Sequence, residues 1–228
     1  PMWLDFPNDS FLNELKELTH KNNALLIFDE VLTGFRLANG GGQELLKIDA
    51  DLSAFGKAIG NGMPLGAITG KEEYMKEFNN VFYSTTYGGE SLSLAAGNAV
   101  VDEYLDKPVI KHCWQMGQNL KDSFNKISSE LKLDAKWNGL PIRGSIEFSN
   151  KNGNSKNILK SLFLQECIKN NIMIGQGESL ISYSHKMKDI KNTIIVFEKA
   201  LQTISEAIQK NNVLDKLKGK EIKSVMTF

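Results

Sequence analysis

Apolar residues recur at two different spacings near the start of the chain. The earliest follow the period of an α-helix, and they are Phe11, Leu12, Leu15 and Leu18. Asp9 or Ser10 can cap the start of this helix. Residues 24–28 then form a continuous apolar run, as in a strand that is buried on both faces of a parallel sheet. A helix followed by such a strand is half of a βαβ unit, so the pattern predicts an α/β domain.

The same reading extends this α/β region to about residue 105. Residues 52–55 and 65–69 match short strands, whereas residues 71–78 and 91–104 return to helical spacing. Three glycines and a proline lie between the first strand and the first residues of the second, and they are Gly60, Gly62, Pro64 and Gly66. Glycine and proline favour tight turns, so we expect the chain to reverse here.

Beyond Tyr104 the pattern changes to an α+β arrangement. We expect helices at 109–131, 155–170 and 188–210, and strands at 133–137, 142–148, 172–174 and 180–183. The first of these helices leaves the α/β region. The predicted organisation is a partial large domain at 1–105, a small α+β domain at 106–212 and a tail at 213–228. The tail contains four lysines and Gly219, which predicts an exposed and poorly ordered segment.

Composition narrows the class of partner. The 228 residues include 27 Lys+Arg and 27 Asp+Glu, so no net charge favours nucleic acid or an anionic membrane surface, and a small molecule is the expected ligand. Cys113 and Cys167 show neither a metal-ligand spacing nor a disulfide framework, which is typical of a reducing compartment such as the cytoplasm. No apolar stretch has the length of a membrane span, and the N-terminus lacks the pattern of a signal peptide.

Two residues suggest a specific chemistry. Asp29 follows the apolar run at 24–28, and Lys57 lies in the sequence Ala-Phe-Gly-Lys-Ala-Ile-Gly-Asn-Gly. Pyridoxal phosphate requires an amine for its aldehyde and a carboxylate that keeps its pyridine nitrogen protonated. Ligands of open α/β sheets bind beyond the carboxyl ends of strands, where Asp29 is expected, and the apolar neighbours of Lys57 predict an enclosed stem. A strand-ending acid and a solvated surface lysine remain the alternative interpretations.

A third segment, residues 82–97, places hydroxyl groups just before two glycines and a helix start. Hydroxyls and free backbone N–H groups at a helix N-terminus suit a phosphate group. A simple N-cap formed by Ser84, Thr85 or Thr86 is equally consistent with the sequence. Both interpretations stay open on these residues alone.

Three segments together resemble class III pyridoxal phosphate-dependent aminotransferases. They are residues 28–36 (Phe-Asp-Glu-Val-Leu-Thr-Gly-Phe-Arg), 55–67 (Phe-Gly-Lys-Ala-Ile-Gly-Asn-Gly-Met-Pro-Leu-Gly-Ala) and 84–89 (Ser-Thr-Thr-Tyr-Gly-Gly). Residues 175–192 also resemble the C-terminal domain of that family. Within the family, the glutamate-1-semialdehyde 2,1-aminomutase branch is the most similar.

The resemblance implies the fold of type I pyridoxal phosphate-dependent transferases and a set of roles. Lys57 would be the Schiff-base lysine, Asp29 would pair with the pyridine nitrogen, Val31 would pack on the ring and Thr86 would bind the phosphate. In that family the threonine serves the cofactor of the neighbouring subunit, so a homodimer is implied. The implied substrates are small amines and carbonyl compounds, and no metal is implied.

Several positions depart from the family pattern. Leu32 stands where many members have glutamine, although the aminomutase branch is also apolar at this position. Glu90 stands where asparagine is usual. No arginine follows Arg143, although many members bind a substrate carboxylate through an arginine of the small domain. This favours an aminomutase-like site, or one for an amino sugar or another substrate without that carboxylate. Arg36 is expected in a salt bridge with Glu30 or another acid rather than in substrate binding.

The family's first phosphate-binding turn and its ring-stacking aromatic residue belong to a half that has no counterpart in these residues. The chain therefore resembles a piece of a longer enzyme, and we expect it to be nearly inactive by itself. The leading hypothesis is an aminotransferase or aminomutase that works through Lys57. The alternative is a catalytically silent fragment or fold relative that acts only through dimer-type association.

Overall fold

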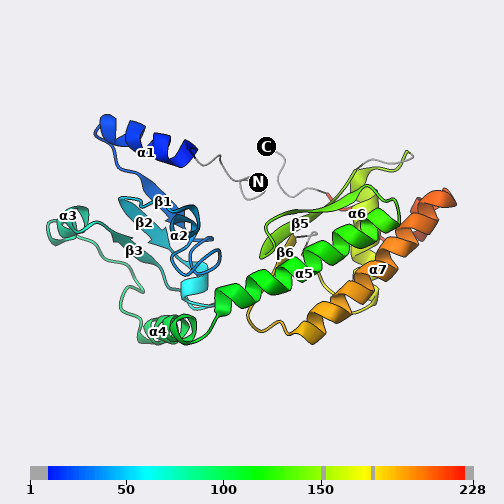
Figure 1. The fold of residues 1–228 in the computed structure, drawn as a ribbon. Coiled ribbons are helices and arrows are strands. Elements are labelled where there is room, and N and C mark those ends of the chain that lie inside the picture. The colour runs from blue at the N-terminus through cyan, green and yellow to red at the C-terminus, as the bar shows by residue number, and fades with distance from the viewer. Residues whose placement is uncertain (1–9, 150–152, 176–177, 224–228) are drawn as a thin grey trace. The chain divides into compact units, whose positions relative to one another are not determined.

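The computed structural model describes residues 10–149, 153–175 and 178–223, which form two compact units (Figure 1). The N-terminal unit ends at Lys111, and the C-terminal unit begins at His112. The division falls within the long helix α5 (Val109–Glu130), a few residues after the boundary that the sequence suggested at 105. Each unit has its own sheet and its own buried residues.

The N-terminal unit contains one three-stranded sheet with the order β1-β2-β3. β1 and β2 are parallel, whereas β2 and β3 are antiparallel. The strands confirm the predictions at 52–55 and near 65–69. The elements are α1 (Phe11–Lys21), β1 (Ile27–Glu30), α2 (Gly42–Leu46), β2 (Leu52–Phe55), η1 (Lys57–Ile59), β3 (Ala67–Gly70), α3 (Glu72–Met75), η2 (Lys76–Asn79) and α4 (Ser91–Asp106).

The burial expected for the first strand is wrong. α1 forms with Ser10 at its N-cap position, but none of its residues is buried, and Asp9 lies outside the described residues. β1 begins three residues later than the apolar run, and the side chain of Ile27 is 60% exposed. Within the described chain β1 pairs with β2 alone, so it is an edge strand rather than a strand enclosed on both sides. A run of apolar letters cannot distinguish these two situations.

The C-terminal unit packs an antiparallel sheet, β4-β5-β6, with three long helices. Aromatic rings from α5, α6 and α7 meet edge to face, with centroids of Phe124 and Phe163 5.8 Å apart and those of Phe124 and Phe197 5.7 Å apart. All three rings are almost fully buried. The elements of this unit are α5 after His112, β4 (Ala135–Gly139), β5 (Arg143–Phe148), α6 (Lys156–Lys169), β6 (Glu178–Leu180), α7 (Met187–Gln209) and α8 (Val213–Lys216).

Two predictions for the C-terminal unit need correction. Residues 172–174 form no strand, and β6 begins two residues earlier than the strand predicted at 180–183. The tail is mostly exposed, as predicted, yet it is attached to the unit: Val213 is buried, and the N–H of Ile222 donates to Ser161 Oγ at 2.9 Å. Within the described ranges, no helix has the combination of length and apolar character that a membrane crossing requires.

Candidate functional site

The parallel pairing of β1 and β2 brings the candidate residues to one edge of the sheet. Asp29 lies opposite Ala54, and Glu30 lies opposite Phe55, so the chain that leaves β2 carries Gly56 and Lys57 past the end of β1. A Cβ atom added at Gly56 would lie 3.3 Å from Val31 Cγ1. The sheet register therefore places Val31 directly against the backbone that precedes the candidate lysine.

Asp29 and Glu30 point to opposite sides of β1 because side chains alternate along a strand. Asp29 is exposed, and its Oδ1 accepts a hydrogen bond from the N–H of Val31 at 3.0 Å. This bond fixes the orientation of the carboxylate. Among the described residues, no other hydrogen bond is made by the Asp29 carboxylate.

Glu30, in contrast, is 1% exposed and is held by hydrogen bonds from the loop that follows β1. Its carboxylate accepts the N–H groups of Gly42 and Gln43, both at 2.9 Å, and the hydroxyl of Thr33. The first two donors open helix α2, where the helix dipole favours negative charge. Gly41 has φ of +83°, and an added Cβ would overlap the Glu30 carboxylate. Sequence reasoning missed this role, because the donors come from the backbone.

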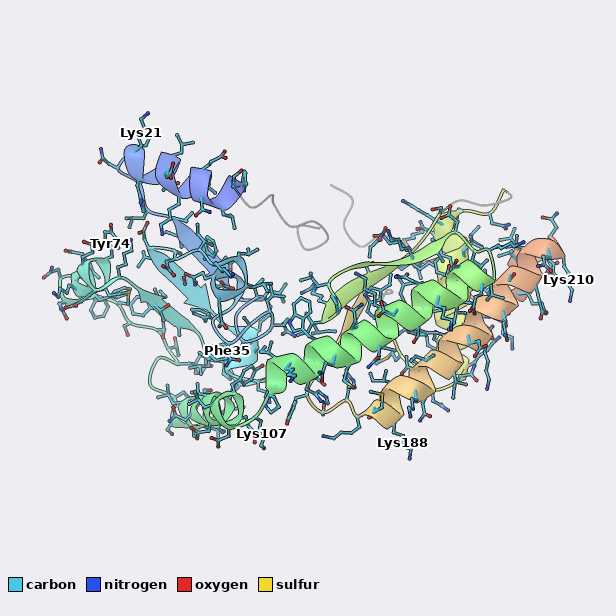
Figure 2. The ribbon with its side chains drawn as sticks, in the orientation of Figure 1. Lys21, Phe35, Tyr74, Lys107, Lys188 and Lys210 are labelled. Carbon is cyan, nitrogen blue, oxygen red and sulfur yellow. The ribbon has the colours of Figure 1, made fainter. Side chains whose placement is uncertain are left out.

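The loop between β1 and α2 has a second anchor, an aromatic one. The ring of Phe35, labelled in Figure 2, meets Phe55 and Tyr104 edge to face, with centroid distances of 6.0 and 5.5 Å. The Tyr104 hydroxyl donates to the carbonyl oxygen of Phe35. Arg36, the next residue, donates from Nε to the carbonyl oxygen of Leu32 at 3.0 Å. The segment from Val31 to Arg36 is thus held in one place beside the end of β2.

Lys57 lies at the start of η1 and lines a cavity of about 490 Å³. The other residues that line it are Arg36, Ala58, Asn61, Gly62, Met63 and Pro64. Lys57 is exposed, which corrects the expectation of an enclosed stem. Its φ of +47° places it in the left-handed region, which a lysine rarely adopts. Within the described ranges its Nζ makes no hydrogen bond or ion pair.

The turn after Lys57 confirms the prediction that the glycines let the chain reverse there. The N–H of Asn61 donates to the carbonyl of Lys57 at 3.1 Å, and the N–H of Met63 donates to that of Gly60 at 2.9 Å. A Cβ at Gly60 would overlap the carbonyl oxygen of Met63, and Gly62 has φ of +105°. Only glycine fits these two positions without strain.

Thr86 lies in a different cavity, of about 410 Å³. Its walls come from β2, β3 and the segment before α4, and they include Ala54, Gly66, Tyr83 and Tyr87. Thr86 is exposed within a turn. The structure of a single copy therefore does not bring Thr86 into the cavity of Lys57.

Glu90 corrects the N-cap interpretation of the segment before α4. It is the N-cap residue of the helix, and its carboxylate accepts the N–H groups of Leu92 at 2.8 Å and Ser93 at 2.7 Å. The Ser93 hydroxyl also donates to it, at 2.5 Å. These bonds, led by that of the Ser93 hydroxyl, lower the pKa of Glu90. The cap is thus neither Ser84, Thr85 nor Thr86, and the Glu90 carboxylate takes two of the first N–H groups of the helix.

A polar cluster lies at the opposite end of β2. The fully buried Asp51 accepts hydrogen bonds from Lys71 Nζ at 2.6 Å, His20 Nε2 at 2.8 Å and the N–H of Leu26 at 2.8 Å. Burial alone raises the pKa of Asp51, but these hydrogen bonds outweigh it and hold that pKa well below its usual range. The cluster ties α1, β1 and the start of α3 to the sheet, so His20 has a structural role.

The remaining titratable candidates are structural within the described residues. His112 Nε2 lies 2.8 Å from the carbonyl oxygen of His185, and the N–H of Ser182 donates to His185 Nδ1 at 3.1 Å, so both histidines order the loop before α7. Both cysteines are buried and neither is in a disulfide with another described residue, and burial raises the pKa of Cys167 to about 12. Within that part of the chain no group of three or more His, Cys, Asp or Glu residues is placed to hold a metal ion.

Comparison with known proteins identifies the family. The profile of aminotransferase class III matches residues 4–175, which is most of the chain. The chain belongs to the class III aminotransferase family. The sheet of the N-terminal unit and the segments around Lys57 and Thr86 all lie within the matched region.

Curated relatives and solved structures agree with this assignment. Glutamate-1-semialdehyde 2,1-aminomutase of Methanosphaera stadtmanae is 32% identical over 210 residues, which cover 86% of this chain and 49% of the relative. The enzyme of that name from Alkaliphilus oremlandii is 43% identical over 132 residues, covering 56% and 31%. A solved transaminase with PLP bound has a TM-score of 0.77 at 26% identity, covering 88% of this chain and 49% of that one. The FumI protein of Sphingopyxis sp. MTA144, with a TM-score of 0.81 at 20% identity and coverage of 90% and 49%, shares the fold.

The similarity covers one part of the fold. The chain spans about half the length of the curated relatives and of the solved structures that it matches over most of its length. The two units are accordingly part of the fold of type I pyridoxal phosphate-dependent transferases, as the sequence implied.

Proposed function

We propose that the chain supplies the lysine side of a pyridoxal phosphate site in an aminotransferase or aminomutase. The observation that carries this proposal is the parallel register of β1 and β2, which places Asp29, Val31 and Lys57 at the same edge of the sheet. A carboxylate, an apolar wall and an amine are the three chemical groups that this cofactor needs from its protein.

The residues fit the group in chemistry and in shape. Gly56 has no side chain, and Val31 lies against it, so a flat ring can approach the backbone beside Lys57. Asp29 Oδ2 would face the pyridine nitrogen, since Oδ1 is engaged by the N–H of Val31. Thr86, in the second cavity, would hold the phosphate of a neighbouring copy. When bound, pyridoxal phosphate supplies an aldehyde that takes an amine as a Schiff base and a ring that accepts electrons.

Each side chain then has a defined task. Lys57 Nζ would hold the aldehyde. When the substrate amine displaces it, the freed amine would move a proton between the substrate Cα and the cofactor carbon. The negative charge of Asp29 would keep the ring nitrogen protonated. The exposed position of Lys57 leaves its amine accessible to a substrate amine.

The substrate class and the assembly belong to the same proposal. Several relatives that match most of this chain, at 30–32% identity, are named glutamate-1-semialdehyde 2,1-aminomutases, which favours a small amino-carbonyl substrate and an aminomutase over a general transaminase. A homodimer is supported by apolar residues around Thr86 that are largely exposed, with Phe82 at 97%, Tyr83 at 62% and Tyr87 at 67%. Two cysteines outside any disulfide suit the cytoplasm.

Reductive trapping tests the central step. The purified chain is incubated with pyridoxal phosphate, reduced with borohydride, digested and mapped by mass spectrometry. We expect the label on the peptide that contains Lys57, at a cofactor concentration at which other lysines remain unlabelled. Lys57→Ala should abolish that label, whereas Lys47→Ala should retain it. Lys47 is a matched control because it is also exposed, lies in the same unit and has a left-handed φ of +54°.

Two results would count against the proposal. Labelling spread evenly over surface lysines would remove any special role for Lys57. Equal behaviour of Lys57→Ala and wild type would favour the alternative, a silent fold relative that acts through association. Conversion of glutamate 1-semialdehyde to 5-aminolevulinate without an external amino acceptor would identify the aminomutase.

A further inference from the structure

Asparagine is followed directly by glycine at four places in the chain, and one of these pairs lines the cavity of Lys57. Asparagine is thermally labile, because its side-chain amide can be attacked by the backbone nitrogen of the next residue. A following glycine favours this attack, since it has no Cβ to hinder the approach. The four pairs are Asn39–Gly40, Asn61–Gly62, Asn138–Gly139 and Asn152–Gly153, and Asn152 lies outside the described residues.

Hydrogen bonds hold two of the three described pairs. The N–H of Gly40 donates to Glu44 Oε2 at 2.7 Å, so the nitrogen that would attack Asn39 is engaged. Asn138 lies in β4, and its side-chain amide donates to Glu147 Oε2 at 2.6 Å. Each of these pairs must break a hydrogen bond to a carboxylate before its asparagine can react, which slows the reaction.

The pair Asn61–Gly62 is held by neither kind of bond. Both residues are exposed, and among the described residues neither the Asn61 amide nor the Gly62 N–H takes part in a hydrogen bond. A Cβ added at Gly62 would have no described neighbour within 4 Å apart from the adjoining residues. The space around the reacting atoms is therefore open, and the attacking nitrogen is available without any prior opening of the turn.

We propose that Asn61 is a site of spontaneous deamidation, which places a new carboxylate in the wall of the Lys57 cavity. The Gly62 nitrogen bonds to Asn61 Cγ and gives up its proton. The bond from Cγ to Nδ2 breaks, and ammonia leaves with one added proton, so the products are a succinimide ring and ammonia. Water then opens one of the two imide C–N bonds of the ring, which yields aspartate or isoaspartate.

The new charge changes the chemistry of the cavity. None of the described residues that line it is acidic in the unmodified chain. A carboxylate near the Lys57 amine stabilises the protonated amine, which cannot attack an aldehyde, and it repels an anionic ligand. Deamidation therefore lowers the reactivity of Lys57 as the protein ages. This effect on Lys57 rests on the proposed function, whereas the modification of Asn61 does not.

Peptide mapping of the ageing protein by mass spectrometry tests the modification. The purified chain is incubated at mildly alkaline pH, and aspartate and isoaspartate are quantified at Asn39 and Asn61 over time. We expect Asn61 to convert about ten-fold faster, the lower end of the range for a hydrogen bond to a charged group at Gly40. In urea-unfolded chain the two rates should be similar. Glu44→Ala, which removes the acceptor, should speed conversion of Asn39 and leave that of Asn61 unchanged.

Reductive trapping with pyridoxal phosphate and borohydride tests the effect on the amine. Asn61→Asp introduces the charge, and aspartate tolerates the left-handed φ of +44° at this position as asparagine does. We expect several-fold less label at Lys57 in this variant than in fresh wild type, at a cofactor concentration below saturation. Aged wild type should lose label in proportion to its deamidation. Asn80→Asp is the matched control, because Asn80 is exposed in the same unit and does not line the cavity.

The outcomes separate the modification from the proposed function. Equal conversion of Asn61 and Asn39 in the folded chain would overturn the modification site. Equal label at Lys57 in fresh wild type, aged wild type and Asn61→Asp would overturn the effect on the amine. If fresh wild type does not trap the cofactor at Lys57 while Asn61 still converts faster, the proposed function fails and the modification site stands.

Discussion

Replacement of Glu30 by glutamine tests how the site loop is held. Glu30 is 1% exposed, and its carboxylate accepts two backbone N–H groups and one hydroxyl. The substitution preserves size and removes the charge. It also turns one acceptor oxygen into an NH₂ group, which then faces a donor. The perturbation is therefore confined to the hydrogen bonds that join β1 to the start of α2.

The expected cost follows from these bonds. A hydrogen bond to a charged group contributes about 1.5–3 kcal/mol, and a buried donor left without an acceptor costs about 1–3 kcal/mol. The bond that remains becomes neutral and loses about 1 kcal/mol, and the N–H left without its acceptor costs about 2 kcal/mol, so the total is about 3 kcal/mol. Since 1.4 kcal/mol is a factor of ten, the loop should open roughly a hundred times more often.

Amide hydrogen exchange measures that opening directly. The N–H groups of Gly42 and Gln43 should exchange roughly a hundred-fold faster in Glu30→Gln than in wild type. Glu44→Gln is the matched control, because Glu44 lies in α2 beside Gln43, accepts the N–H of Gly40 at 2.7 Å and is exposed. It should change exchange at these two amides far less. Equal exchange in the two variants would refute the assignment of Glu30 as the anchor of the loop.

Two further predictions concern buried or capping acids. Asp51→Asn should destabilise the N-terminal unit by about 2 kcal/mol above pH 5, because charge-assisted hydrogen bonds are lost. The pKa of Asp51 is lowered, so its contribution is complete above the unfolded pKa of about 3.9 and is lost as pH falls below it. Denaturation of that unit from pH 6 to pH 2 should therefore show a smaller pH dependence in the variant, and an unchanged dependence would contradict this. Glu90→Ala should speed exchange at the Leu92 and Ser93 amides about five-fold, the size of a lost N-cap, whereas Glu90→Asn, which can still cap, should not.

The sequence by itself determined most of the elements and the family. Long helices such as α5 and α7 follow from their apolar period, and β2 has the bounds that its residues indicated. The glycine turn follows from local backbone freedom. These features are predictable because the forces that set them act between residues close in sequence. The family resemblance, confirmed by the profile match, likewise rests on local motifs.

Only the tertiary structure decided how each polar residue is used. Asp29 and Glu30 are adjacent letters, yet one faces outward at the site while the other is buried and anchors a loop. The N-cap of α4 is Glu90, and Arg36 shares a cavity with Lys57. These roles depend on the register between β1 and β2 and on backbone donors that lie up to thirteen positions away in sequence. A charged group takes its partner from whatever the fold brings within about 3 Å, and spacing along the chain does not encode that neighbour.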